Sequence, residues 1–324
     1  MCEKVPRLAL AIPTYQRSEI LLSNLRKMEE ELLDHGVEVY VSDDSPDNLT
    51  EQALAPLTFV KYRRNEPSLR HDANLLATLT WPRAEFVWLL GDSHWILNGK
   101  LSEILRFLDR EDFAFINSCA ADRRIVPETF GPKAIELVQD KLWHQTLTGA
   151  TIYSRRVCRW IENQGENLLV KKDFPQLSAM LGFASTHQET LRISWFGSPS
   201  LGSVPKTCYW HRDIVPVFVD HWSDLVEAFP SMVPRSLRTR TIRAHSANQN
   251  LFGFLTLLDL KLRGVYNLKR LRDPRFRRAM HLSLLTLTVA LLMPKPFISI
   301  AKYIRRFLGF AKTSRRMKFD ANMS

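Results

Sequence analysis

Residues 86–95 read FVWLLGDSHW, and this stretch decides the fold of the 324-residue sequence. Its first five residues are all apolar, which is typical of a central strand covered on both faces of a parallel sheet. LALAI at 8–12 is a second run of this kind. Where the run at 86–90 stops, Gly91 would let the backbone approach a ligand closely, and a lone acid, Asp92, follows. We therefore expect a buried strand that ends at a polar site.

Strand and helix patterns alternate on both sides of this stretch. The alternation predicts an α/β domain with a mostly parallel central sheet flanked by helices. The expected strands are 8–12, 37–41, 59–63, 86–90, 112–117 and 148–156, and the expected helices are 19–33, 68–80, 100–109 and 174–184.

Polar residues cluster directly after four of these strands, at 14–17, 43–48, 65–70 and 92–94. In open α/β sheets, ligands bind in the crevice outside the carboxyl ends of the strands. The four clusters therefore predict one binding site. The alternative is structural, because loops are polar in most proteins.

The net charge of +11 is distributed unevenly along the chain. Residues 261–318 contain 16 Lys or Arg and one acid, whereas the other residues contain 29 basic and 33 acidic side chains. A basic C-terminal module favours a polyanionic partner. We expect one domain over 1–248 and a basic, helical, membrane-associating extension over 249–324.

Two segments of the extension suggest a membrane surface. LSLLTLTVALLM at 282–293 is uncharged but too short to span a bilayer. FISIAKYIRRFLGF at 297–310 forms a basic amphipathic helix, which is typical of the membrane interface, although a solvated face on a core helix is the alternative. Nucleic acid is disfavoured because this helix is too apolar and the rest of the chain is not basic.

Cysteine usage and the N-terminal residues bear on the compartment. The four cysteines are widely separated, which favours a reducing compartment, and Pro13 interrupts the first apolar run too early for a signal peptide. We expect a cytoplasmic protein that is peripheral on the inner face of the cytoplasmic membrane.

Four blocks together resemble a known family: IPTYQR (12–17), VYVSDDSPDN (39–48), YRRNEPSLRHDAN (62–74) and FVWLLGDS (86–93). Their order and spacing are similar to those of the inverting family 2 glycosyltransferases, which have the GT-A fold. TGATIYSRR (148–156) and DFPQL (173–177) resemble the bacterial branch that builds O-antigen and capsular polysaccharides. The resemblance implies transfer of a hexosyl or deoxyhexosyl group, with inversion, from a nucleotide-sugar donor to a lipid-linked saccharide acceptor.

The resemblance also implies which residues bind the nucleotide. One of Asp43 and Asp44 would bind the base or ribose while the other caps its loop. The full implied set is Pro13, Thr14, Tyr15, Arg17, Asp43, Asp44, Asn65, Arg70, Asn74 and Asp92.

Asp92 stands where the family places its metal-binding acids, but Ser93 and His94 replace the acids that usually follow. Mg²⁺ and Mn²⁺ prefer carboxylate oxygens, and Mn²⁺ also accepts imidazole. The expected metal ligands are Asp92 and His94, with either cation stabilising the departing diphosphate. The missing acids leave the metal requirement open, and His94 without a role is the alternative.

Inverting transfer needs a base for the acceptor hydroxyl, and the family uses an acid at the head of a helix. Asp173, in KKDFPQL, is the first candidate, with a helix N-cap as its alternative role, and Glu189 is the second. His211 and His221 could approach the diphosphate.

Two other functional classes remain open. A nucleotidyltransferase would share the sheet and the carboxylate chemistry, but it should carry a glycine-rich loop after the first strand, and IPTYQR has no glycine. A non-catalytic protein that binds nucleotide-sugar or membrane, and has lost its metal acids, is the other class.

Overall fold

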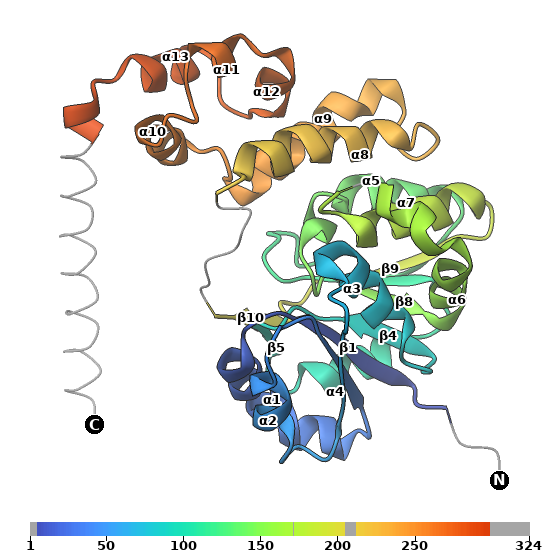
Figure 1. Ribbon diagram of the computed structural model, residues 1–324. Coiled ribbons are helices and arrows are strands. Elements are labelled where there is room, and N and C mark those ends of the chain that lie inside the picture. Colours follow the sequence, from blue (N-terminus) through green and yellow to red (C-terminus); the bar gives the residue numbers. More distant parts are fainter. Residues whose placement is uncertain (1–4, 171, 205–211, 299–324) are drawn as a thin grey trace, which may run out of the picture. The chain divides into compact units, whose positions relative to one another are not determined.

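The computed structural model describes residues 5–170, 172–204 and 212–298 (Figure 1). The chain divides into two compact units, residues 1–242 and 243–324. The division falls inside α9 (Arg235–Gln249), near the boundary expected at 248.

The first unit is built on an eight-stranded sheet with the order β3-β2-β1-β4-β8-β6-β9-β7. The four strands from β3 to β4 are parallel, β8 is antiparallel to both β4 and β6, β9 is parallel to β6, and β7 is antiparallel to β9. The mixed α/β fold expected from the sequence is confirmed. The strands are β1 (Leu8–Thr14), β2 (Glu38–Asp43), β3 (Val60–Arg64), β4 (Phe86–Leu89), β6 (Phe113–Ile116), β7 (Val126–Phe130), β8 (Thr151–Ser154) and β9 (Arg192–Phe196), with a separate ribbon of β5 (His94–Ile96) and β10 (Leu201–Ser203).

Helices cover both faces of the sheet (Figure 1). One face carries α1 (Ser18–Asp34), α2 (Leu49–Leu54) and α4 (Lys100–Phe107), and the other carries α3 (Arg70–Thr80), α6 (Arg155–Gln164) and α7 (Pro175–Thr186). The unit also contains α5 (Pro132–Lys141), short 3₁₀ turns at His144–Thr146 and Gly165–Val170, a π-helical turn at Pro216–His221, and α8 (Trp222–Ala228).

The alternation of side chains in β1 explains this layering. Leu8, Leu10 and Ile12 point into the core beneath α1, whereas the smaller Ala9 faces the opposite side. The small side chain lets α3 pack closely on β1. Both faces of β1 are therefore covered, as expected for a central strand.

The parallel strands bring their polar ends together at one edge of the sheet. Thr14 of β1 lies beside Asp43 of β2, and the Asp44 backbone N–H donates to the Thr14 carbonyl at 3.0 Å. On the other side of β1, the Leu90 N–H donates to the Ala11 carbonyl at 2.9 Å, which places Gly91 and Asp92 beside the end of β1. The strand expected over 148–156 is shorter than predicted, because Ser154 caps α6 and β8 ends there.

The second unit is helical in the part that the structure describes. It contains α10 (Phe254–Leu262), α11 (Leu268–Arg272), α12 (Pro274–Ala279) and α13 (Leu284–Leu292). Its core includes Tyr266, which stacks on Phe276 with ring centroids 5.7 Å apart and donates its hydroxyl to the Leu287 carbonyl at 2.6 Å. Among the described helices, none is long and apolar enough to cross a membrane. The helix expected over 297–310 lies, beyond Ile298, outside the described residues.

Candidate active site

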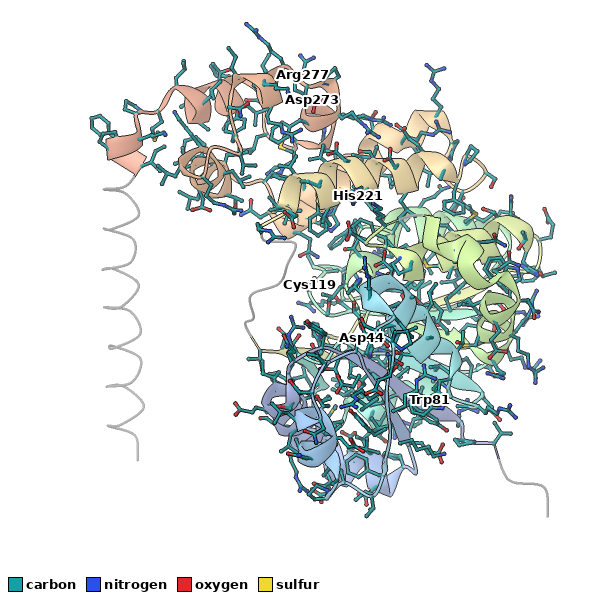
Figure 2. All side chains as sticks on the ribbon, viewed as in Figure 1. Asp44, Trp81, Cys119, His221, Asp273 and Arg277 are labelled. Atoms are coloured by element: carbon teal, nitrogen blue, oxygen red, sulfur yellow. The ribbon has the colours of Figure 1, made fainter. Side chains whose placement is uncertain are left out.

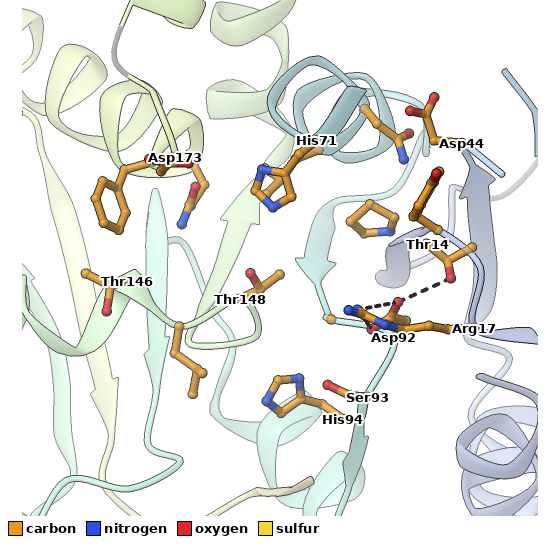
Figure 3. A pocket seen from close by; sticks show the side chains of 18 of the residues that line it. Thr14, Arg17, Asp44, His71, Asp92, Ser93, His94, Thr146, Thr148 and Asp173 are labelled. Atoms are coloured by element: carbon orange, nitrogen blue, oxygen red, sulfur yellow. Dashed lines mark hydrogen bonds and ion pairs between the residues drawn. The ribbon is translucent and has the colours of Figure 1, made fainter. Parts of the chain in front are cut away.

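A pocket of about 700 Å³ lies at the carboxyl edge of β1, β2 and β4 (Figure 3). Asp43 and Asn65 do not line it, Glu189 is exposed on the loop before β9, and His211 is outside the described residues. The predicted residues that line the pocket are Pro13, Thr14, Tyr15, Arg17, Asp44, Arg70, Asn74, Asp92, His94 and Asp173.

Asp92 is a buried carboxylate held by several donors. Arg17 Nη1 lies 3.1 Å from both carboxylate oxygens, and Thr14 Oγ1 donates to Oδ2 at 3.2 Å (Figure 3). Asn24 fixes the backbone by donating to the Asp92 carbonyl at 3.0 Å. The Asp92 side chain is only 4 % exposed and that of Arg17 is 29 % exposed, so their ion pair is screened less by solvent than a surface pair. The result is a rigidly placed acid whose charge is balanced by a cation that also lines the pocket.

Gly91 has a steric role that the sequence did not reveal. A Cβ atom at position 91 would lie 2.8 Å from His94 Nδ1, and real Cβ atoms essentially never approach another heavy atom so closely. The glycine therefore makes room for the His94 ring. That ring projects from β5, where His94 pairs with Ser203, and lies apart from the Asp92 carboxylate (Figure 3).

Two side chains of the pocket are of the kinds that bind Mg²⁺ or Mn²⁺. Among the residues that the structure describes, no group of three or more His, Cys, Asp and Glu side chains is placed to hold a metal. Asp92 and His94 nevertheless both line the pocket. Mg²⁺ sites in nucleotide enzymes commonly use one or two protein ligands and take the rest from phosphates and water. The chemistry of the two side chains suits such a cation, although the His94 ring lies apart from the Asp92 carboxylate (Figure 3).

Asp44 holds the loop that leads into α3. Its Oδ1 accepts from the Leu69 N–H at 2.7 Å and from Asn65 Nδ2 at 3.3 Å, and its Oδ2 accepts from the Arg70 N–H at 2.8 Å and from Ser68 Oγ at 2.6 Å. The carboxylate thereby organises residues 65–70. It faces the pocket with most of its acceptor capacity already used.

Asp43 is also committed to internal bonds. Its Oδ1 accepts from the Ser45 N–H at 2.9 Å and the Ser45 hydroxyl at 2.5 Å, and its Oδ2 accepts from the Tyr62 hydroxyl at 2.9 Å. Burial, and then the neighbouring Asp43 carboxylate, raise the pKa of Tyr62 well above its ordinary value. Both acids therefore stabilise loops, and only Asp44 lines the pocket.

Arg70 and Asn74 lie at the start of α3. Asn74 donates to the Ser42 carbonyl at 3.1 Å and accepts from Asn65 Nδ2 at 3.0 Å, so these two amides brace β2 against α3. Arg70 has a φ of +62°, which is unfavourable for a residue with a side chain and is characteristic of functional sites. Its exposed guanidinium lines the pocket and makes no side-chain hydrogen bond to the described residues.

Asp173 lies across the pocket from Asp92 (Figure 3). Its backbone has a φ of +67°, and its N–H donates to Asp72 Oδ2 at 3.0 Å. Its Oδ2 lies 2.5 Å from His221 Nδ1. The N-cap of α7 is Phe174, the residue after Asp173. The N-cap role considered for Asp173 is therefore wrong.

Residues 9–156 match the family model described as Glycosyl transferase family 2. This segment of the chain is therefore similar to the family 2 glycosyltransferases. A curated relative, abequosyltransferase RfbV of Salmonella typhimurium (strain LT2), is 28 % identical over 112 residues, which cover 32 % of this chain and 33 % of the relative. The match thus spans about a third of that relative's length.

Solved glycosyltransferase structures share the GT-A fold of this chain. S. aureus TarS 1–349 has a TM-score of 0.55 at 15 % identity, with 88 % of this chain and 81 % of TarS covered. The structure of TarS 1–349 in complex with UDP-GlcNAc has a TM-score of 0.53 at 13 % identity, with coverage of 88 % and 90 %.

The family 2 segment supplies only part of the pocket. The residues from Pro13 to Thr148 that line it lie inside the matched segment, whereas Asp173 and Phe218 lie beyond it. Sequence reasoning did not single out twelve further lining residues, some of which lie in connections and others inside α3, α7, β10 and the turn at Pro216–His221. These are Ser68, His71, Leu75, Thr146, Leu147, Thr148, Phe174, Gln176, Ser203, Val204, Val217 and Phe218.

Proposed function

We propose that this chain is an inverting glycosyltransferase of surface-polysaccharide biosynthesis. It moves a hexosyl or deoxyhexosyl group from a nucleotide-sugar to a saccharide acceptor carried on a lipid. The observation that supports this most directly is the single pocket that contains both Asp92, from the family 2 segment, and Asp173, from outside it. The relative RfbV, an abequosyltransferase by name, supports the choice of sugar transfer as the reaction.

The nucleotide side of the pocket supplies positive charge and polar contacts. Tyr15, Asn74, Arg17 and Arg70 line the same pocket. In this proposal Tyr15 and Asn74 contact the nucleoside, and the two guanidinium groups neutralise the diphosphate. Asp92 contacts the ribose or a cation. A Mg²⁺ or Mn²⁺ held by Asp92 and His94 would supply further positive charge beside the leaving group.

Asp173 is the base in this proposal. Its carboxylate takes the proton of the acceptor hydroxyl while the hydroxyl oxygen forms a bond to the anomeric carbon. The bond from that carbon to the phosphate oxygen breaks on the opposite side, and its electron pair leaves with the nucleoside diphosphate. Attack opposite the leaving group inverts the anomeric centre. Phe174, Val217 and Phe218 provide an apolar wall that limits competing hydrolysis.

Asp173→Asn tests this assignment. We expect kcat to fall by about 10²–10⁴-fold, because a general base contributes that much, while donor binding is preserved. Transfer would be followed by mass spectrometry over UDP-, GDP-, CDP- and dTDP-sugars with a lipid-linked acceptor and Mn²⁺, and nucleotide binding by calorimetry.

Glu189→Gln is the matched control, since it removes the other candidate acid at an exposed position outside the pocket. It should change turnover by less than about twofold, as surface substitutions usually do. An inactive Glu189→Gln beside an active Asp173→Asn would reverse the assignment. Nucleotide binding by the wild type without transfer to any acceptor would support the non-catalytic alternative.

The second unit supports a lipid surface as partner, in a peripheral position on the inner face of the cytoplasmic membrane. Four apolar residues of α13 are exposed on one side of the helix, with Leu285 74 % and Leu292 73 % exposed, and Phe297 beyond the helix is 64 % exposed. The opposite side, with Leu287 and Ala290, is buried. An exposed apolar helix face is typical of an interfacial helix.

The charge of the same unit specifies the kind of lipid. Residues 261–298 contain nine Lys or Arg and one acid, Asp273, which is labelled with Arg277 in Figure 2. Each basic residue near an anionic bilayer contributes roughly 1 kcal/mol to binding. We therefore commit to an anionic bilayer as the occupant of the α13 face.

Vesicle sedimentation with the full chain tests the lipid partner. We expect binding to phosphatidylcholine vesicles that contain phosphatidylglycerol, weaker binding without it, and loss at high salt. The double variant Leu285→Asp/Leu292→Asp should weaken binding by about 100-fold, because each buried leucine contributes roughly 1.5 kcal/mol or more.

Leu33→Asp, at a leucine of α1 that is 54 % exposed, is the control and should bind like the wild type. Equal binding by the double variant and the wild type would contradict the proposal. Concentration-dependent dimerisation that the double variant abolishes would instead assign the α13 face to a second copy of the chain.

A further inference from the structure

His221 lies next to the proposed base in an unusual piece of backbone. His221, which is labelled in Figure 2, is the last residue of the π-helical turn Pro216–His221, and α8 begins at the next residue. π-Helical turns are rare and frequently occur at functional sites, because the wider turn repositions a side chain. The sequence suggested that His221 could approach the diphosphate. In the structure it meets Asp173 instead and does not line the pocket.

An aromatic cluster fixes the π-helical turn against the residue that follows Asp173. The Phe174 ring packs on Phe218 and Trp222, with centroids 5.9 Å and 5.8 Å apart. Trp222 is fully buried, and its indole N–H donates to the Ile242 carbonyl at 3.2 Å. The distance between His221 and Asp173 is therefore set by packed side chains on both elements.

The short contact determines which imidazole nitrogen carries the proton. His221 Nδ1 and Asp173 Oδ2 are 2.5 Å apart, and the two side chains are 32 % and 16 % exposed. An ionised carboxylate can only accept hydrogen bonds, so Nδ1 must donate. Hydrogen bonds to an ionised acceptor are short and roughly twice as strong as neutral ones.

The Asp173 backbone is also held from its other side. Its N–H donates to Asp72 Oδ2, and Asp72 Oδ1 is 2.7 Å from His71 Nδ1. Asp173 thus keeps a left-handed backbone conformation between α3 and the π-helical turn. Strained residues of this kind persist where the surrounding contacts specify their position strongly.

We infer that His221 is a positioning residue for glycosyl transfer. Its Nδ1–H binds Oδ2 of Asp173 and thereby orients the carboxylate that receives the proton of the acceptor hydroxyl. His221 acts through Asp173 and touches neither donor nor acceptor. The inference rests on the proposed role of Asp173 as base, and the expected cost of losing such an orienting partner is on the order of 10–100-fold in rate.

Two substitutions separate positioning from folding. His221→Ala should lower kcat by about 10–100-fold while the KM for the donor stays within about twofold. His221→Asn places an amide N–H where Nδ1–H was, and it should recover kcat to within about threefold of the wild type. His35→Ala, at an exposed histidine after α1, is the control and should behave like the wild type.

A double variant tests whether His221 acts through the base. Asp173→Asn/His221→Ala should be no slower than Asp173→Asn alone, since a positioning residue has no effect once its partner is lost. Full kcat in His221→Ala, or no recovery in His221→Asn, would overturn the inference. A loss confined to KM or to the melting temperature would do so as well.

Nitrogen-15 NMR of the histidines in the full chain needs no substrate. The Nδ1 signal of His221 should have the shift of a protonated, hydrogen-bonded nitrogen in the wild type, and it should change in Asp173→Ala. An unchanged spectrum overturns the pairing itself. If the pairing is present but the wild type transfers no sugar with any donor, the proposed function has failed while the contact has not.

Discussion

The parallel half of the sheet, β3-β2-β1-β4, and the mixed half, β8-β6-β9-β7, use buried polar residues in different ways. At the end of β4, Asp92 faces the pocket with Arg17 as its counter-ion. In the mixed half, Asn117 donates to the carbonyls of Ala120, Asp122 and Gly197, and none of its bonds reaches the pocket. The first arrangement places an ion pair at the pocket, whereas the second holds a loop in place.

The two halves should therefore respond differently to substitution. A change at the pocket end of the parallel half should alter turnover more than folding, because the proposed function assigns the charge there to ligand binding. A change in the mixed half should alter folding more than turnover, because a buried group that loses its partner carries a desolvation cost.

Asp92→Asn is expected to have the largest effect on turnover of the substitutions that test this comparison. The amide keeps the shape but removes the charge that faces the ligand and balances Arg17. We expect kcat/KM to fall by roughly 10²–10³-fold, as when a single electrostatic group is removed from an active site. Steady-state transfer assays and denaturant unfolding would be measured on the same preparation.

Asp112→Asn makes the same chemical change in the mixed half and is the matched control. Asp112 accepts from the Arg192 N–H at 3.0 Å and from Arg156 Nη1 at 3.1 Å, and it is absent from the pocket lining. It should lower the free energy of unfolding by about 1–3 kcal/mol, with turnover per folded molecule little changed. If Asp112→Asn abolished transfer and Asp92→Asn only unfolded the protein, the proposed difference between the two halves of the sheet would be refuted.

The same division explains how much of the fold the sequence could predict. In the parallel half, β1 and β4 are local apolar runs and all four strands are followed by a polar cluster, so the pattern identifies both the strands and their site ends. The mixed half depends on distant pairing. β7, with the sequence VPETF, contains a proline and two polar residues and is a strand only because β9 pairs with it at the sheet edge.

The site was predictable to a similar extent. The strand-end rule brought Thr14, Asp44 and Asp92 together correctly, because parallel strands end at one edge. It could not place Thr148, which is held near β4 by the hydrogen bond from the Trp88 indole to the Gly149 carbonyl at 2.8 Å. Nor could it show that Gly91 makes room for His94, because that contact depends on the turn into β5.

His144 tests the comparison through the pH dependence of folding rather than through turnover. It is fully buried in the mixed half, and its Nε2 accepts from the Ser118 N–H at 3.2 Å, so its neutral form is the one that fits. Burial, and then the nearby Lys141 charge, lower the pKa of His144 to about 4 from an ordinary value of 6.5.

Between these two pKa values the unfolded chain binds a proton that the folded chain does not. The free energy of unfolding should therefore have its full His144 contribution above pH 6.5, and it should lose about 3 kcal/mol as the pH falls to about 4. His144→Gln cannot take up this proton, so its unfolding free energy should depend less on pH in that window.

Urea unfolding from pH 7 to pH 4 measures the pH dependence of the unfolding free energy in both proteins. His35→Gln, at an exposed histidine, should keep the wild-type slope. Identical slopes for His144→Gln and the wild type would show that the mixed half does not bury a neutral histidine, and the contrast with the charged, ligand-facing end of β4 would then be lost.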